Sequence, residues 1–222
     1  MDIYHVFNRG VEKRDVVISD DDRMRFVHSL YIFNDSNNAP NCISQPKQWQ
    51  SNTNRKCIVR IHAWCLMNNH YHLLLSPVDG ELKNISLFMK KLNMGYAKFF
   101  NEKYGRSGYL WQGKYKKVLI SNDSQFEYIP YYLHLNPLDY SHGNWRTGTV
   151  RENEINEVMK QLRTYRWSSY LDYNNIKNFP SIIYSEFLTK VFNRTGFQNK
   201  QIRQIISGNS PVYSNIKNKL EK

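Results

Sequence analysis

Two histidines stand one residue apart in the stretch LMNNHYHLLL, residues 66–75. Residues i and i+2 of a β-strand point to the same side, so His70 and His72 are expected to project together while Tyr71 points into the packing. Two imidazoles on one face can hold one divalent metal, although such pairs also occur as ordinary surface or core residues. The apolar run that follows favours the metal, because an unliganded imidazole in an apolar strand is costly. The pair therefore predicts a metal site at the start of a strand.

A second pair of residues, Tyr132 and Asn136, lies four positions apart in YIPYYLHLNP, residues 128–137. Residues i and i+4 share one face of a helix, so both side chains would face the metal if that helix lay over the histidine strand. Two imidazoles and one amide oxygen, with open positions for phosphate oxygens, would suit Mg²⁺ or Mn²⁺. The alternative for Asn136 is a helix C-cap before Pro137.

The elements that must position these residues follow from hydrophobic periodicity and from capping signals, such as Ser19 before a run of acids. Residues 36–55, rich in Asn, Ser, Gln and Pro, are expected to form a loop. Pro130 argues against a straight final helix. The expected strands are 3–8, about 57–67, 70–76 and 113–120, and the expected helices are 19–35, 82–104 and 121–137. This order predicts an α+β fold: a ferredoxin-like split βαβ antiparallel sheet with helices on one face, plus a helical C-terminal extension.

The chain is strongly basic, with 31 Lys and Arg against 19 Asp and Glu, and 14% of its residues are aromatic. Such a protein most often binds nucleic acid, and aromatic rings stack on unpaired bases. Residues 83–120 hold nine basic residues and one acid. The alternative is a solvated helix face with a packed tryptophan. The residues expected to contact DNA are Asn8, Arg9, Arg14, Lys83, Lys90, Lys91, Lys98, Trp111, Lys114, Tyr115, Lys116 and Lys117.

Several classes of protein are disfavoured by the same composition. No apolar run is long enough to cross a membrane, and the N-terminus MDIYHVFNRG is not that of a signal peptide. The three cysteines form no close C-x-x-C pair, which argues against a disulfide framework or a four-cysteine zinc site. We therefore expect a cytoplasmic protein without a membrane partner.

Four segments together resemble the REP-associated tyrosine transposases, which belong to the single-tyrosine HUH transposases of the IS200-like family. They are YHVFNRG, HAWCLMNNHYHLLL, YLHLNP and YRWSSYLDY. The resemblance runs from about residue 2 to residue 173. Two departures stand out: Asn68 replaces a proline that is frequent in the family, and Pro130 precedes the matching tyrosine by two residues.

The resemblance implies that His70 and His72 bind Mg²⁺ or Mn²⁺, that Tyr132 is the nucleophile and that Asn136 completes the site. Tyr131, about 100° around the helix, is the rival nucleophile. The implied activity is a metal-dependent endonuclease and strand transferase that cleaves and rejoins single-stranded DNA at hairpin-associated sites. The reaction passes through a 5′-phosphotyrosine intermediate and uses no nucleotide cofactor. Both homodimers and monomers occur in the family.

Three segments are expected on this basis: a catalytic domain at 1–138, a family-like helical segment at 139–173 and a C-terminal extension without assigned role at 174–222. Two other functions compete with the transposase. One is a non-catalytic binder of single-stranded nucleic acid on the same sheet. The other is a metal-dependent hydrolase that releases its product without a covalent link.

Overall fold

A computed structural model describes residues 1–37, 55–194 and 198–210 of the chain. The described residues form two compact units. The first unit comprises residues 1–61 and 66–117, and the second comprises residues 62–65 and those from 118 onward. The expected loop at 36–55 lies mostly outside the described residues. No helix in the described ranges is both long enough and apolar enough to cross a membrane.

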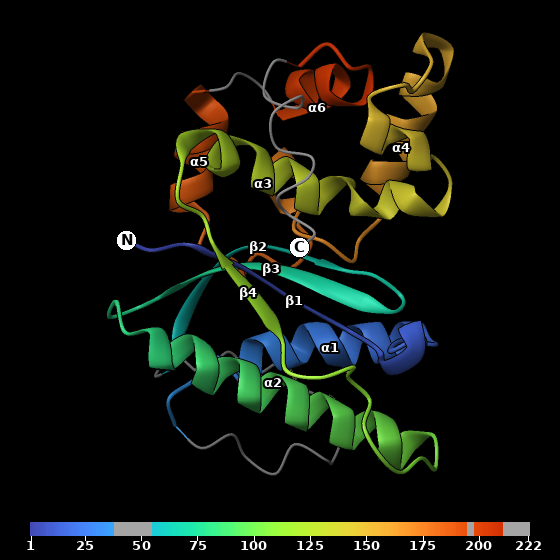
Figure 1. Cartoon of the computed structure of the whole chain (residues 1–222). Coiled ribbons are helices and arrows are strands. Elements are labelled where there is room, and N and C mark those ends of the chain that lie inside the picture. Colours follow the sequence, from blue (N-terminus) through green and yellow to red (C-terminus); the bar gives the residue numbers. More distant parts are fainter. Residues whose placement is uncertain (38–54, 195–197, 211–222) are drawn as a thin grey trace. The chain divides into compact units, whose positions relative to one another are not determined.

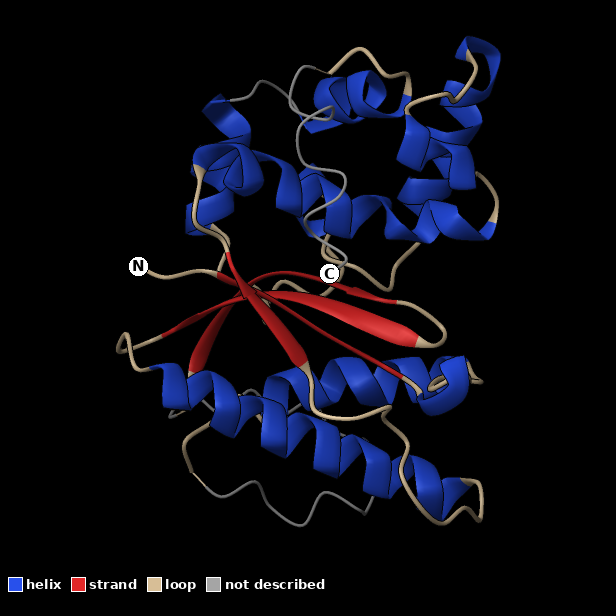
Figure 2. Ribbon diagram, viewed as in Figure 1, coloured by secondary structure: helices blue, strands red, loops and turns tan. Residues whose placement is uncertain are grey.

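One four-stranded sheet organises the fold, with the strand order β2-β3-β1-β4. The strands are drawn in red in Figure 2. Its strands are β1 (Tyr4–Arg9), β2 (Val59–Leu66), β3 (His70–Pro77) and β4 (Lys116–Leu119). β1 pairs antiparallel with β3, in a register that sets Phe7 opposite His72 and Arg9 opposite His70. This order, with the succession β-α-β-β-α-β along the chain, confirms the predicted split βαβ fold.

Two helices, α1 (Asp20–Ile32) and α2 (Leu82–Lys103), cover one face of this sheet (Figure 1). A capping box starts α1: the Ser19 side chain accepts from the backbone of Asp22, and the Asp22 side chain accepts from the backbone of Ser19. α2 buries an apolar stripe that comprises Ile85, Phe88, Met89, Leu92, Tyr96 and Phe100. These helices supply the core against which the site strands are held.

Several elements are shorter than the sequence predicts, and for two of them, α1 and β4, a local reason is visible. The first helix ends at Ile32 because the Asn34 side chain is used to bond the backbone of Ile58 and Val59. The last strand begins only at Lys116, since the carbonyl of Gly113 accepts from the Asn8 side chain at 3.1 Å instead of joining a backbone ladder. Side-chain amides thus replace regular backbone pairing at both places.

The second unit is mainly helical, which confirms the predicted C-terminal extension. Its helices are α3 (Asp123–Leu135), α4 (Ile155–Thr164), α5 (Glu186–Arg194) and α6 (Gln198–Ile206). α3 is continuous through Pro130, and the Asn122 side chain caps its first turn. Two 3₁₀ turns, Asn136–Tyr140 and Gly143–Thr147, follow α3. The predicted boundaries at 138/139 and 173/174 stay predictions.

Candidate active site

The two histidines of β3 project from the sheet face opposite α1 and α2. Their ring centroids are 5.0 Å apart and their planes are perpendicular. Between them, Tyr71 is fully buried on the other face, where its hydroxyl donates to Asn93 of α2 at 2.7 Å. The strand alternation therefore does what the sequence predicts, and it brings His70 and His72 together on one surface.

Each of the two imidazoles is held through its Nδ1 atom. Nδ1 of His70 lies 2.6 Å from Oδ1 of Asn69. Nδ1 of His72 lies 2.9 Å from Nε2 of His5, on the neighbouring strand β1. Burial lowers the pKa of His5 to about 3, so this imidazole is neutral at pH 7. In both ligand rings Nε2 is the nitrogen that would face a cation.

This donor set fits a divalent metal. Histidines that bind metals typically engage the second ring nitrogen in a hydrogen bond, as His70 and His72 both do. Within residues 1–37, 55–194 and 198–210, no group of three or more His, Cys, Asp or Glu side chains could hold a metal. Amide, water and substrate oxygens are ligands that Mg²⁺ and Mn²⁺ accept beside imidazole nitrogens.

Asn136 is fully buried at the C-terminal end of α3. Its Nδ2 donates to the carbonyl of Tyr132 at 2.7 Å, and its Oδ1 accepts from Nη2 of Arg146 at 3.1 Å. The side chain thus satisfies a carbonyl at a helix end, which is the capping role considered from sequence. Metal ligation by Asn136 stays a prediction, and it would draw on the second lone pair of the same oxygen.

Tyr132, the predicted nucleophile, lies beside a guanidinium group in the second unit. The guanidinium carbon of Arg146 is 5.3 Å from the centre of the Tyr132 ring, and Trp145 packs against the same ring. Tyr132 itself is 5% exposed. A cation here stabilises negative charge on the phenol oxygen.

Arg146 is anchored by a carboxylate. Its Nε donates to Oδ1 of Asp139 at 2.9 Å and its Nη2 donates to Oδ2 at 2.6 Å. Burial lowers the pKa of Arg146, but the hydrogen bonds of Asp139 and the charge of a Tyr132 phenolate outweigh this and raise it, so the group stays cationic. The sequence motifs did not indicate Arg146, because it lies ten residues after Asn136 and belongs to none of them.

The neighbouring residues of α3 have other surroundings. Tyr131 is 2% exposed and packs against Phe192 of α5. Nε2 of His134 lies 2.9 Å from Oγ of Ser169, and its Nδ1 accepts from Gln198 at 2.7 Å. Burial lowers the pKa of His134 to about 3. His134 therefore contributes to the packing of the second unit.

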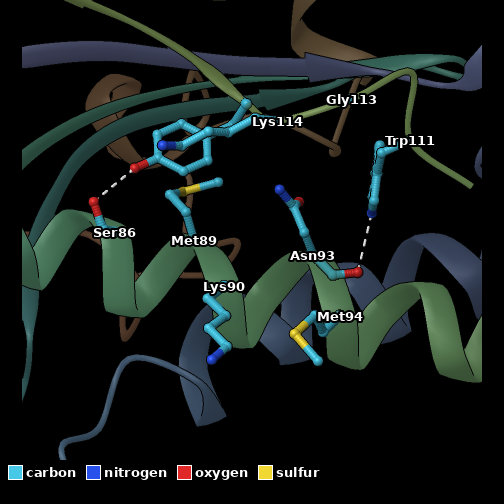
Figure 3. Close-up of a pocket in the computed structure, with 9 residues that line it drawn as sticks. Ser86, Met89, Lys90, Asn93, Met94, Trp111, Gly113 and Lys114 are labelled. Atoms are coloured by element: carbon cyan, nitrogen blue, oxygen red, sulfur yellow. Dashed lines mark hydrogen bonds between the residues drawn. The ribbon is translucent and has the colours of Figure 1, made fainter. Parts of the chain in front are cut away.

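A pocket of about 340 Å³ opens in the first unit between α2 and residues 111–115 (Figure 3). The Trp111 indole donates to the carbonyl of Asn93 at 3.0 Å, and the Tyr115 hydroxyl lies 3.0 Å from Oγ of Ser86. Trp111 is 8% exposed and also packs against Tyr71. The side chains that line the pocket include Met89, Lys90, Met94, Trp111, Lys114 and Tyr115.

Most of the remaining basic residues expected to contact DNA are exposed, namely Arg9, Lys83, Lys90, Lys98, Lys114, Lys116 and Lys117. Some of them also contact protein: Lys116 and Lys117 lie over the rings of Phe7 and Tyr4, and Lys83 and Lys98 pair with Glu81 and Glu102. Arg14 pairs with Glu12, and Lys91 donates to the carbonyls of Asp35 and Asn37. Asn8 is 6% exposed and holds the carbonyl of Gly113.

The fold and the site define a split βαβ protein with a candidate His-x-His metal site. Residues 26–136 match the family described as Transposase IS200 like. This match covers half of the chain, and the chain belongs to that family. It includes His70, His72 and Tyr132, and it ends at Asn136. Membership in a transposase family confirms the resemblance noted from the sequence.

A solved structure of a REP-associated tyrosine transposase bound to a REP hairpin is similar to this chain. The two share 13% sequence identity and a TM-score of 0.45, over 80% of this chain and 82% of the other. No curated protein was found to match the chain.

Proposed function

We propose that this transposase cleaves and rejoins single-stranded DNA at hairpin-associated sites, with Tyr132 as the nucleophile and Mg²⁺ or Mn²⁺ held by His70 and His72. The observation that carries the proposal is the histidine pair: two same-face imidazoles, each engaged through Nδ1. The proposal places the protein in the cytoplasm, because its DNA substrate is there.

The bond changes of the proposed reaction balance without any energy source. The phenol oxygen of Tyr132 attacks phosphorus and loses its proton to water, the P–O3′ bond breaks, and the leaving oxygen takes up a proton as a 3′-hydroxyl. When bound, a divalent cation would polarise the scissile phosphate as a Lewis acid. The phosphotyrosine conserves the bond energy, so a 3′-hydroxyl of another strand can reverse the step and no ATP is needed.

Residues of the second unit have distinct parts in this proposal. Arg146 stabilises the phenolate of Tyr132 while Asp139 keeps the guanidinium in place. Asn136 holds the end of α3 through the Tyr132 carbonyl, and its amide oxygen would serve as a further ligand for the metal. An ordered tyrosine beside a fixed cation supports a nucleophilic role, because a phenol with a pKa near 10 is otherwise weakly nucleophilic at pH 7.

DNA binding is proposed for the basic face of the first unit. The exposed Lys90 and Lys114 flank the pocket, where they would contact phosphates. Trp111 and Tyr115 line the same pocket and would offer aromatic surface to an unpaired base. A single strand with a hairpin would present both features together.

The test uses a hairpin DNA with single-stranded flanks, incubated with the full chain and Mn²⁺ and resolved on a denaturing gel. A 5′-phosphotyrosine puts the 3′ fragment on the protein, so a 3′-end label should appear in a protein band. A 5′-end label should appear only in a shortened free strand. Tyr132→Phe should abolish the protein band, Tyr131→Phe should keep it, and EDTA should remove it from the wild type.

The same gel distinguishes the competing functions. Cut DNA without a labelled protein band would indicate a hydrolase and contradict the covalent step. Bound but uncut DNA would indicate a binder of single-stranded nucleic acid. A covalent band that persists in Tyr132→Phe would place the nucleophile elsewhere.

A further inference from the structure

Asn69 lies between a strained turn and the first histidine. The turn after β1 contains two consecutive non-glycine residues in the left-handed region, Glu12 (φ 56°) and Lys13 (φ 61°). Nδ2 of Asn69 donates to the carbonyl of Lys13 at 3.1 Å, and the backbone carbonyl of Asn69 accepts from Gly10 at 2.8 Å. Strained residues persist where their surroundings hold them, and they concentrate at functional sites. The Asn69 amide is therefore fixed at one end.

The other end of the same amide sets the state of His70. An amide oxygen accepts hydrogen bonds and cannot donate them, so the 2.6 Å contact between Asn69 Oδ1 and His70 Nδ1 requires the proton on Nδ1. Nε2 of His70 then carries the lone pair. This is the tautomer that binds a metal through Nε2, and the contact also fixes the orientation of the ring.

The second histidine is oriented by a different residue. His72 contacts His5 across the β1–β3 pair, and His5 stacks on Phe7 with ring centroids 5.0 Å apart. The two ligand rings thus have separate supports, one from a turn and one from a strand. A change at Asn69 should disturb His70 and leave the support of His72 in place.

We propose that Asn69 is a positioning residue of the metal site, which holds His70 in its metal-binding tautomer by linking the ring to the turn at Lys13. The inference rests on the proposed function for the presence of the metal. Loss of such a supporting hydrogen bond typically weakens metal binding about 10- to 100-fold.

The affinity test is calorimetric titration of the metal-free full chain with Mn²⁺. Asn69→Ala should bind Mn²⁺ about 10- to 100-fold more weakly than the wild type. Asn69→Asp should bind Mn²⁺ with an affinity between those of Asn69→Ala and the wild type, because a carboxylate keeps the acceptor for Nδ1 but cannot donate to the Lys13 carbonyl. Asn68→Ala is the matched control, because Asn68 lies beside Asn69 in the connection between β2 and β3 and its side chain accepts from Arg23. The Mn²⁺ affinity of this variant should stay near that of the wild type.

A second measurement reads the tautomer directly and needs no variant. Long-range ¹H–¹⁵N correlation spectra of the metal-free wild type should show His70 with its proton on Nδ1. If the wild type binds no Mn²⁺, the proposed metal-dependent function fails, while the spectra still decide the role of Asn69. Equal affinity of Asn69→Ala and the wild type, equal weakness of Asn69→Asp and Asn69→Ala, or a proton on Nε2 of His70 would each overturn the inference.

Discussion

At the scale of single residues, Arg146 adds most to what the histidines and the tyrosine suggest. It contacts three groups at once: the Asn136 amide oxygen, the Asp139 carboxylate and the face of the Tyr132 ring. A carboxylate anchor and two aromatic neighbours keep the guanidinium in one place, which is what a charge-stabilising group requires. Its contacts link the predicted nucleophile to the predicted amide ligand.

Replacement of Arg146 should therefore slow formation of the covalent adduct. We expect Arg146→Ala to reduce the single-turnover rate about a hundredfold, as loss of one fixed charge-stabilising donor typically does. Arg146→Lys keeps the charge but not the two-pronged bond to Asp139, and should fall between the alanine variant and the wild type. Quench-flow or manual sampling of the labelled protein band gives the rates.

Arg151→Ala removes an exposed arginine from the same unit and serves as the control. Its rate should match the wild type. A rate for Arg146→Ala equal to that of Arg151→Ala, with both proteins folded by circular dichroism, would refute the role of Arg146.

At the scale of elements, the segment YRWSSYLDY joins other elements of the second unit through the hydroxyl of Ser169. Oγ of Ser169 accepts from the backbone of Trp64, in the part of β2 that belongs to this unit, and contacts Nε2 of His134 in α3. Gln198 of α6 donates to the other side of the same imidazole. The buried imidazole of His134 is therefore bonded on one side to Ser169, which also bonds β2, and on the other side to α6.

Removing the Ser169 hydroxyl should lower the free energy of unfolding. Ser169→Ala leaves a buried backbone N–H and an imidazole N–H without their acceptor, which should cost about 1–3 kcal/mol of unfolding free energy. Ser168→Ala is the matched control: that residue is equally buried, but its hydroxyl accepts only a 3.3 Å bond from Tyr170. The urea midpoint of Ser169→Ala should be clearly lower than that of Ser168→Ala. Equal midpoints would contradict this role of the Ser169 hydroxyl.

The buried imidazole of His134 also makes stability depend on pH. Its folded pKa of about 3 lies below the ordinary value of 6.5, so the unfolded chain binds an extra proton between these values. The stability from the neutral ring is present above pH 6.5 and is lost as the pH falls through the window toward 3, by about 1.4 kcal/mol per pH unit. Unfolding measured at pH 7.5, 6 and 5 should show this decline.

His134→Gln removes the titrating group. It should reduce the slope of unfolding free energy against pH by the amount that one proton contributes, about 1.4 kcal/mol per pH unit. His5, whose burial also lowers its pKa to about 3, should retain its own contribution in that variant. Parallel slopes for the wild type and His134→Gln would show that His134 does not titrate in this way.

At the scale of the whole molecule, the formal charge of +12 favours binding to a polyanion, and its placement should decide where DNA binds. The exposed Lys90 and Lys114 line the pocket of the first unit. Lys83 and Lys98 of α2 are exposed as well but pair with carboxylates of their own helix or its start, and Lys91 donates to a backbone carbonyl. DNA affinity should depend on the lysines that can reach a phosphate more than on the total charge of the chain. Each such contact releases counterions from the DNA, which is what favours binding.

The double variant Lys90→Ala/Lys114→Ala should weaken binding to single-stranded DNA and flatten its salt dependence. Removal of one lysine that binds a phosphate should reduce the slope of log affinity against log salt by about one. Fluorescence anisotropy at several salt concentrations measures both quantities. Lys160→Ala, an exposed lysine on α4, is the control for loss of charge alone, and its slope should stay at the wild-type value. An equally reduced slope in both variants would show that total charge, and not the lysines beside the pocket, sets the salt dependence.

Local periodicity accounts for what the sequence by itself determined. The spacing of two placed His70 and His72 on one sheet face, and the spacing of four placed the Asn136 amide at the Tyr132 carbonyl. The strand order followed as well, because split βαβ connections leave few alternatives. The motifs indicated the family because each is a short run of residues that can be read without the fold.

Only the tertiary structure decided which residues support the site. His5 meets His72 across 67 positions and Arg146 meets Asn136 across ten, through strand register in one case and a pair of 3₁₀ turns in the other. Hydrogen bonds of this kind depend on angles and ångström-scale distances between separate elements. Periodicity says which face a side chain occupies, but the partner on that face is set by how the chain returns to it.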